Sequence, residues 1–179
     1  MENFQKNESL SSIETDLREK INFAKIHALS QEEYENILDE EFKMKDIESK
    51  RKLTDEEVNY FYEFRKRMIE ATITIGTLPE AKRVMEILGF DNASLIDTLS
   101  HENAHGNKAE QLGAWHLGYK FCLIKADDGD FLIQPQANIN IPENLEKEEQ
   151  NKILSEIIFA PEEYDNKLSR GDREDLEHL

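Results

Sequence analysis

Residues 119–139 read YKFCLIKADDGDFLIQPQANI and contain the clearest strand signal in the chain. Residues 119–125 alternate and are β-prone, residues 127–130 are typical of a turn, and residues 131–139 resume the β-prone pattern. Pro135 predicts that the second strand lies at a sheet edge, because proline cannot donate a ladder hydrogen bond. The stretch therefore predicts a β-hairpin.

The sequence on both sides of this hairpin is typical of helices. Ser30 and Thr54 each begin a capping box, and Gly89 is a typical helix end. Residues 71–76 fit either a short strand or the frayed end of a helix. Apolar spacing and caps predict six helices, at about residues 11–29, 31–50, 55–70, 78–88, 92–113 and 142–159. We therefore expect a predominantly α-helical α+β fold, with about six helices and one β-hairpin packed near the fifth helix.

The organisation along the chain predicts three regions. Residues 1–75 form a helical N-terminal region that acts as an arm or a flap. Residues 76–168 form a metal-site domain with the fifth helix, the hairpin and a C-terminal helix. Residues 169–179 are a charged tail, which we expect to be mobile.

The composition restricts the function. The 179 residues include 22 basic and 39 acidic residues, for a net charge of −17. This charge repels phosphate backbones and anionic membranes, so nucleic-acid and membrane partners are not expected. No secretory signal or apolar membrane span is visible, which favours a cytoplasmic location. The single cysteine, Cys122, excludes an internal disulfide framework and a cysteine-based zinc site, and its apolar surroundings predict a buried, inert thiol.

Residues 100–105 read SHENAH and contain the strongest functional signal. On a helix, His101 and His105 lie about 40° apart and face away from the apolar stripe of the first turns. Two neutral imidazoles one turn apart can bind one metal ion from the same side. Glu102 stands beside the first imidazole, where a carboxylate can take a proton from a metal-activated water. The pattern predicts a metal site in a cleft beside this helix.

The sequence His101-Glu102-Asn103-Ala104-His105 resembles the HExxH motif of the zincin-like zinc metallopeptidases. The resemblance implies Zn²⁺ as cofactor, His101 and His105 as metal ligands, Glu102 as the catalytic general base, and a peptide or protein substrate. It covers the motif only. Lys108 and Gln111 stand where the longer metzincin motif has glycine and histidine, which excludes that subgroup. The hairpin also follows the motif helix, whereas zincins carry most of their sheet before it.

The third metal ligand has two candidates. His116 can reach the pair only if the fifth helix breaks at Gly113, because on an unbroken helix it would stand about 22 Å from His101. Glu146 on the sixth helix is the competitor, and Glu143 also points inward near the start of that helix. The sequence leaves both alternatives open, together with the absence of any third ligand.

Two functions follow from these patterns. The first is a zinc-dependent hydrolase, most simply a peptidase that uses metal-activated water with Glu102 as general base. The alternative is a non-catalytic acidic helical interaction protein in which HENAH is incidental or a structural metal site. A different metal-dependent enzyme, with a transition metal other than zinc, is a third interpretation. The sequence does not specify an oligomeric state.

Overall fold

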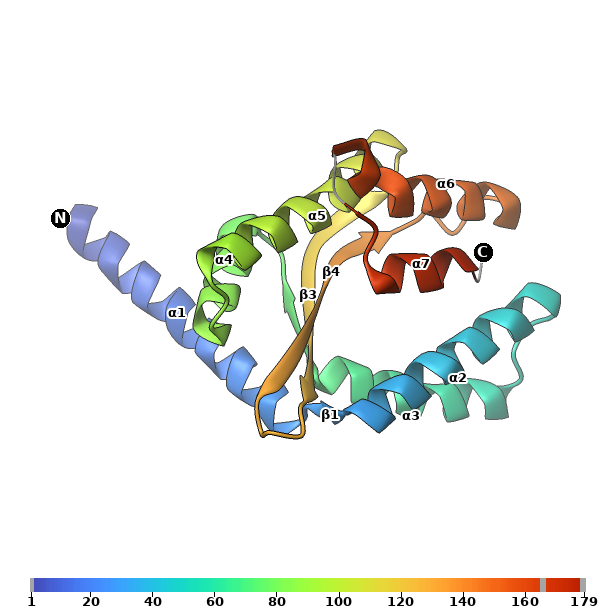
Figure 1. Cartoon of the computed structure of the whole chain (residues 1–179), viewed down its shortest axis with the longest axis horizontal. Helices are drawn as coiled ribbons and strands as arrows, with labels where there is room; N and C mark the ends of the chain where they lie inside the picture. The colour runs from blue at the N-terminus through green and yellow to red at the C-terminus, as the bar shows by residue number, and fades with distance from the viewer. Residues whose placement is uncertain (1, 165–166, 178–179) are drawn as a thin grey trace. The chain divides into compact units, whose positions relative to one another are not determined.

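The computed structural model of the chain describes residues 2–164 and 167–177, which form helices and a small mixed sheet (Figure 1). The fold is α+β and predominantly helical, as predicted. In chain order, the elements of this part are α1 (Glu2–Ile26), β1 (Leu29–Ser30), α2 (Gln31–Lys50), α3 (Asp55–Glu70), β2 (Thr72–Ile75), α4 (Leu78–Leu88), α5 (Asn92–Gln111), β3 (Trp115–Lys125), β4 (Phe131–Asn140), α6 (Lys147–Phe159), the 3₁₀ helix η1 (Ala160–Tyr164) and α7 (Arg170–Glu177).

The predicted helix starts are confirmed by their capping geometry. The Ser30 hydroxyl accepts the Glu33 backbone N–H at 3.1 Å, and the Glu33 carboxylate accepts the Ser30 N–H at 2.9 Å. Thr54 and Glu57 repeat this arrangement at the start of α3. Each box satisfies two backbone donors that have no partner inside the helix. Gly89, with φ of 92°, ends α4 in the left-handed conformation that glycine favours.

Strand β3 is the central strand of the sheet. It pairs with β1 in parallel, with Leu29 opposite Ile124, and it also pairs with β2 and β4. The predicted hairpin is therefore confirmed as β3 and β4, which run side by side in Figure 1. The first strand begins at Trp115, earlier than the sequence predicts. Residues 72–75 form a strand, which decides between the two alternatives for that segment.

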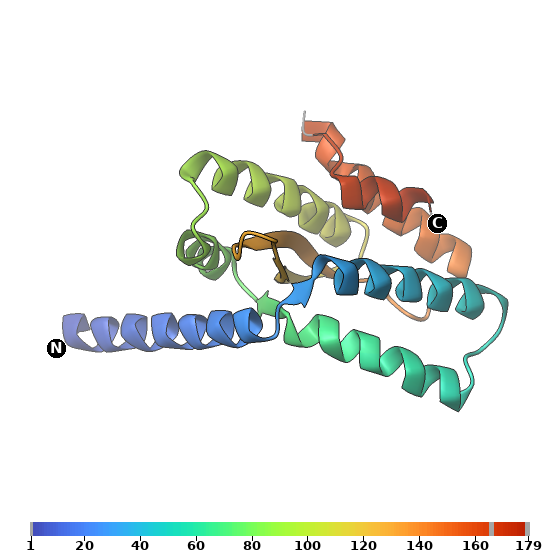
Figure 2. The same ribbon diagram turned by 60° about the horizontal axis from the view of Figure 1, so that its bottom comes forward.

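The described chain divides into two compact units. The first comprises Met1–Ile73 with Phe121–Gln134, and the second comprises Thr74–Lys120 with Pro135–Leu179. In the first unit, α2 and α3 contact each other along their lengths (Figure 2). Their inner faces pack with β1 and β3 in a core cluster of buried residues, Leu29, Ile37, Ala71, Cys122 and Ile124.

The helices were also compared with the requirements of a membrane span. A spanning helix needs about 20 consecutive, predominantly apolar residues. Within residues 2–164 and 167–177, no helix combines that length with that apolar character.

Cys122 lies in the core of the first unit, as predicted. Its thiol is buried, and burial raises the pKa of the thiol to about 11 because the thiolate loses its hydration. The thiolate is the reactive form of cysteine. The structure therefore places this side chain among packing residues.

We expect the Cys122 thiol to react slowly with a disulfide reagent at pH 8. With a pKa of about 11 the thiolate fraction at pH 8 is roughly 200-fold lower than that of an ordinary cysteine with a pKa near 8.5. The measurement compares the labelling rate of the native protein with that of the urea-unfolded protein. Equal rates in the two states would show that Cys122 is accessible and unperturbed.

Candidate metal centre

Helix α5 carries the motif and lies entirely in the second unit. Asp91 begins the helix, because its carboxylate accepts the backbone N–H groups of Ala93 and Ser94, both at 2.9 Å. The helix ends at Leu112, and Gly113 follows with φ of 81°. The break at Gly113 on which the His116 alternative depends is therefore present, and the chain continues into β3.

The motif directs its side chains to two sides of α5. His101 and His105 share one side, while Glu102 and Gly106 lie about 100° further round the helix. Glu102 and His105 are the only buried polar or charged residues among those whose burial the structure describes. Buried polar side chains need partners, because water no longer satisfies them. Glu102 and His105 therefore need hydrogen-bond partners from other parts of the fold.

The backbone of α6 fixes the orientation of His105. The Nδ1 atom of His105 lies 2.8 Å from the carbonyl oxygen of Ile157, in the last turn of α6. A carbonyl only accepts, so Nδ1 carries the proton and the lone pair of a neutral ring is on Nε2. The side chain of Ile157 packs in a cluster with Ala109 and Ala114. The same residue thus joins α6 to α5 and prepares His105 Nε2 for a ligand.

Asp172 of α7 completes the group. Its Oδ2 lies 3.0 Å from His101 Nε2, its Oδ1 lies 3.3 Å from His105 Nε2, and the two Nε2 atoms are 3.2 Å apart. Within the described part of the chain, these three residues are the one group of metal-ligating side chains whose ligand atoms converge. We call them the His–Asp cluster.

The spacing of the His–Asp cluster fits a zinc ion. Ligands about 2.0–2.1 Å from a tetrahedral zinc are separated from each other by about 3.3–3.4 Å. The separations of 3.0, 3.2 and 3.3 Å are close to that value, although the two histidines face different oxygens of Asp172. One ligand atom from each residue lies within 4.8 Å of the others. Three protein ligands leave a fourth position for water, which is the ligand count of catalytic zinc sites. The donor set, two imidazoles and one carboxylate, is also one that zinc prefers.

Glu102 lies beside the cluster but points to the hairpin. Its Oε2 accepts the backbone N–H of Ala137 in β4, at 2.6 Å. Burial raises the pKa of Glu102 to about 7, although His105, His101 and the Ala137 N–H each oppose that shift. A carboxyl group with a pKa near neutral is suited to take up and release a proton at pH 7.

Opposite charges shift the pKa values of the cluster in opposite directions. Burial by itself would raise the pKa of Asp172, but hydrogen bonds with His101, His105 and Ser169 hold it well below its usual range. Burial would lower the pKa of His105, but the bonds to Asp172 and Ile157 raise it overall. The carboxylate is therefore ionised, which is the form that binds a metal.

The structure does not bring either predicted third ligand to the histidine pair. His116 lies on β3, and its ring packs over Gly106 and against the edge of the Tyr119 ring, with centroids 5.2 Å apart. Gly106 is about 100° round the helix from His105, so His116 is on the hairpin side of α5. Tyr119 donates to Asn103 on the same side. His116 is thus a packing partner of α5, with Nε2 buried and no partner in the described residues.

Glu146 is also distant from the pair, for a different reason. It is exposed at the N-cap of α6, which begins at Lys147, later than predicted. His105 contacts Ile157 in the last turn of that helix, and eleven residues of helix separate the two positions by roughly 16 Å. Glu143, which precedes the helix, is exposed as well.

Asp172 could have been recognised from one local signal in the sequence. Residues 169–172, Ser-Arg-Gly-Asp, have the spacing of a capping box. Ser169 N–H donates to Asp172 Oδ2 at 2.7 Å, and Asp172 N–H donates to Ser169 Oγ at 3.1 Å. The region predicted as a mobile charged tail therefore contains helix α7, while His178 lies outside the described residues. The capping signal predicts a helix, but it does not predict contact with His101 or His105.

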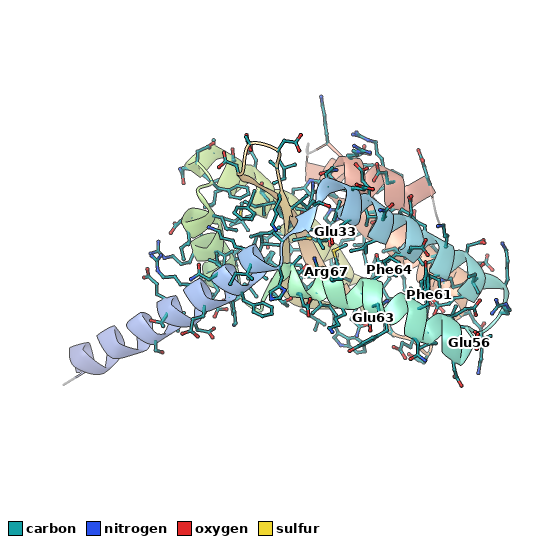
Figure 3. All side chains as sticks on the ribbon, turned by 90° about the horizontal axis from the view of Figure 1, so that it is seen from below. Glu33, Glu56, Phe61, Glu63, Phe64 and Arg67 are labelled. Carbon is teal, nitrogen blue, oxygen red and sulfur yellow. The ribbon has the colours of Figure 1, made fainter. Side chains whose placement is uncertain are left out.

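Two hollows lie away from the His–Asp cluster. One, of about 640 Å³, lies between α4 and α5 in the second unit, on the side of α5 opposite the histidines, and is lined by residues that include Leu78, Ile96 and Leu99. The other, of about 220 Å³, lies between α2 and α3 in the first unit, beside Phe64 and Arg67 (Figure 3). Neither includes a residue of the cluster.

We expect Gly106→Ala to destabilise the protein, although alanine is favoured over glycine in a helix by about 1 kcal/mol. A Cβ at position 106 would overlap the His116 ring, and such overpacking costs about 1–3 kcal/mol. Urea unfolding measures the change. In a His116→Ala background the ring is absent, so the same substitution should be neutral or stabilising. Stabilisation of the otherwise unchanged protein by Gly106→Ala would contradict the packing described here.

The chain was compared with known proteins by family, by sequence and by structure. No protein-family model matches the sequence. No curated protein matches it, and no solved structure matches its fold. The motif and the geometry of the His–Asp cluster are the features that indicate a candidate metal centre.

Proposed function

We propose that the protein is a zinc-dependent hydrolase, and specifically a peptidase, with His101, His105 and Asp172 as metal ligands and Glu102 as general base. The observation that carries the proposal is the convergence of two imidazoles and both oxygens of the Asp172 carboxylate, with contacts of 3.0–3.3 Å between them and a buried carboxyl group beside them. In this proposal Asp172 is the third metal ligand, the role for which the sequence offered His116 and Glu146 as candidates.

Each residue has a definite role in this proposal. A zinc ion in the cluster would polarise the substrate carbonyl and lower the pKa of its water towards about 7. Glu102 accepts the proton of the attacking water and returns it to the leaving amine. The Ala137 N–H holds one oxygen of Glu102 in place, so the other oxygen exchanges the proton. The Ile157 carbonyl keeps His105 in the tautomer that binds zinc.

The charge of the chain supports a choice among substrates. With a net charge of −17, the protein attracts cationic peptides and repels nucleic acids and anionic membranes. We therefore propose peptide or protein substrates with basic segments. We also propose that the protein is cytoplasmic.

The alternative function is an acidic helical interaction protein without catalysis. Its support comes from α3 in the first unit, where Val58, Tyr60 and Tyr62 are exposed. Exposed aromatic side chains are common at protein interfaces. The metal measurement below separates the two functions, because the alternative does not require a bound ion.

We expect about one zinc per chain in the purified, untagged protein after zinc loading and desalting, because a site with three protein ligands retains the ion. Elemental analysis measures it. Glu102→Gln should keep the metal, whereas the His101→Ala/His105→Ala variant should lose it. His116→Ala should keep it, since His116 is not a ligand. Absence of zinc from the loaded wild-type protein would leave the interaction protein as the function.

We expect Glu102→Gln to abolish hydrolysis without removing the metal. General acid–base catalysis contributes typically about 10²–10⁴-fold to the rate, and glutamine cannot accept the proton. Cleavage of a quenched fluorescent peptide library, with basic and acidic members, measures the rate. The matched control is Glu110→Gln, an exposed carboxylate on the same helix, which should leave the rate unchanged. Full activity in zinc-loaded Glu102→Gln would exclude this mechanism.

A further inference from the structure

Helix α7 is attached to the second unit with little apolar packing. It has no buried residue, whereas α4, α5 and α6 of the same unit each bury two or more. It lies beside α6 (Figure 1). Burial of apolar side chains is normally what holds a helix on a domain, and an isolated helix of eight residues is unstable in water. Another interaction must therefore hold α7 in place.

Asp172 supplies that interaction. It bonds with His101 and His105 of α5, and its side chain is only 14% exposed. The flanking residues Gly171 and Arg173 are exposed. Asp172 thus joins α7 to α5 through one carboxylate and two imidazoles.

The same carboxylate also begins the helix. Asp172 Oδ2 accepts the N–H of Ser169 at 2.7 Å while it faces His101, and the Ser169 hydroxyl accepts the N–H of Asp172 at 3.1 Å. These two bonds hold the carboxylate in one rotamer and satisfy two backbone donors at the start of α7. The hydrogen bonds that begin helix α7 therefore also orient the Asp172 oxygens towards His101.

We propose that residues 167–177, the C-terminal segment, are ordered by the metal, with Ser169 as the positioning residue for Asp172. This inference rests on the proposed metal centre and adds its regulation. Metal binding stabilises the folded segment, and by reciprocity the folded segment raises the affinity for metal. A change that releases the segment, such as cleavage or capture of the C-terminus, leaves a two-histidine site with weak affinity and so switches the enzyme off.

Trypsin tests the order of the segment directly, because Lys167, Arg170 and Arg173 lie within it. The full chain is treated with trypsin after metal removal and after zinc reconstitution, and intact mass spectrometry follows each cleavage. Cleavage tracks the population of the open segment. We expect zinc to slow cleavage at these three sites by about tenfold or more, with no effect after Arg51, which follows α2 in the first unit.

Variants separate ligand, positioning and structural roles. Asp172→Asn should weaken zinc binding by more than the roughly 10–100-fold typical of residues that only orient a ligand, and should remove the protection from trypsin. Glu177→Gln, an exposed carboxylate on the same helix, is the matched control and should behave as wild type. Ser169→Ala should weaken zinc binding about tenfold and shift the absorption spectrum of the cobalt-substituted protein, and Ser169→Thr should restore both.

Two results would overturn the inference, and they differ in what else they exclude. One zinc per chain with unchanged cleavage of the C-terminal segment means that the metal does not order it, while the hydrolase proposal stands. No bound zinc means that the hydrolase proposal and the coupling both fail. An unaltered cobalt spectrum in Ser169→Ala would remove the positioning role alone.

Discussion

The hydrogen bond between His105 Nδ1 and the Ile157 carbonyl, 2.8 Å long, is the interaction on which the site depends. It joins the motif helix to the last turn of α6, at the point where Ile157 also enters the apolar cluster of that unit. Because the carbonyl only accepts, the bond places a proton on Nδ1 and leaves Nε2 as the ring nitrogen that faces Asp172 and His101. Ile157 therefore contributes its side chain to the apolar cluster and its carbonyl oxygen to the orientation of His105.

The side chains of the motif lie on two different sides of α5. One side places Glu102 and Gly106 against the hairpin, where Ala137 and His116 hold them. The other places the histidines towards α6 and α7. Glu102 follows His101 directly in the sequence, and the 100° step of a helix turns its side chain away from the histidine side. The hairpin then supplies the backbone donor that orients the carboxylate without binding the metal.

The C-terminal region is a charged segment that is joined to α5 by polar contacts. Its composition offers no apolar face, and α7 buries no residue. Its helix starts with a carboxylate that simultaneously faces two imidazoles. The element with the least packing thus supplies the third ligand atom of the candidate centre, which connects ligand binding to local stability.

The sequence by itself determined the predominantly helical α+β class, the hairpin, the capped starts of α2 and α3, and the candidate residues His101, Glu102 and His105. These follow from local rules, because caps, turns and helical spacing involve residues near each other in the chain. Only the tertiary structure decided the third member of the cluster. Asp172 is 67 positions beyond His105 in the sequence, and no local pattern reports which distant carboxylate a fold brings to an imidazole. His116 was nearer in sequence, yet the turn at Gly113 carried it to the hairpin side of α5, against Gly106.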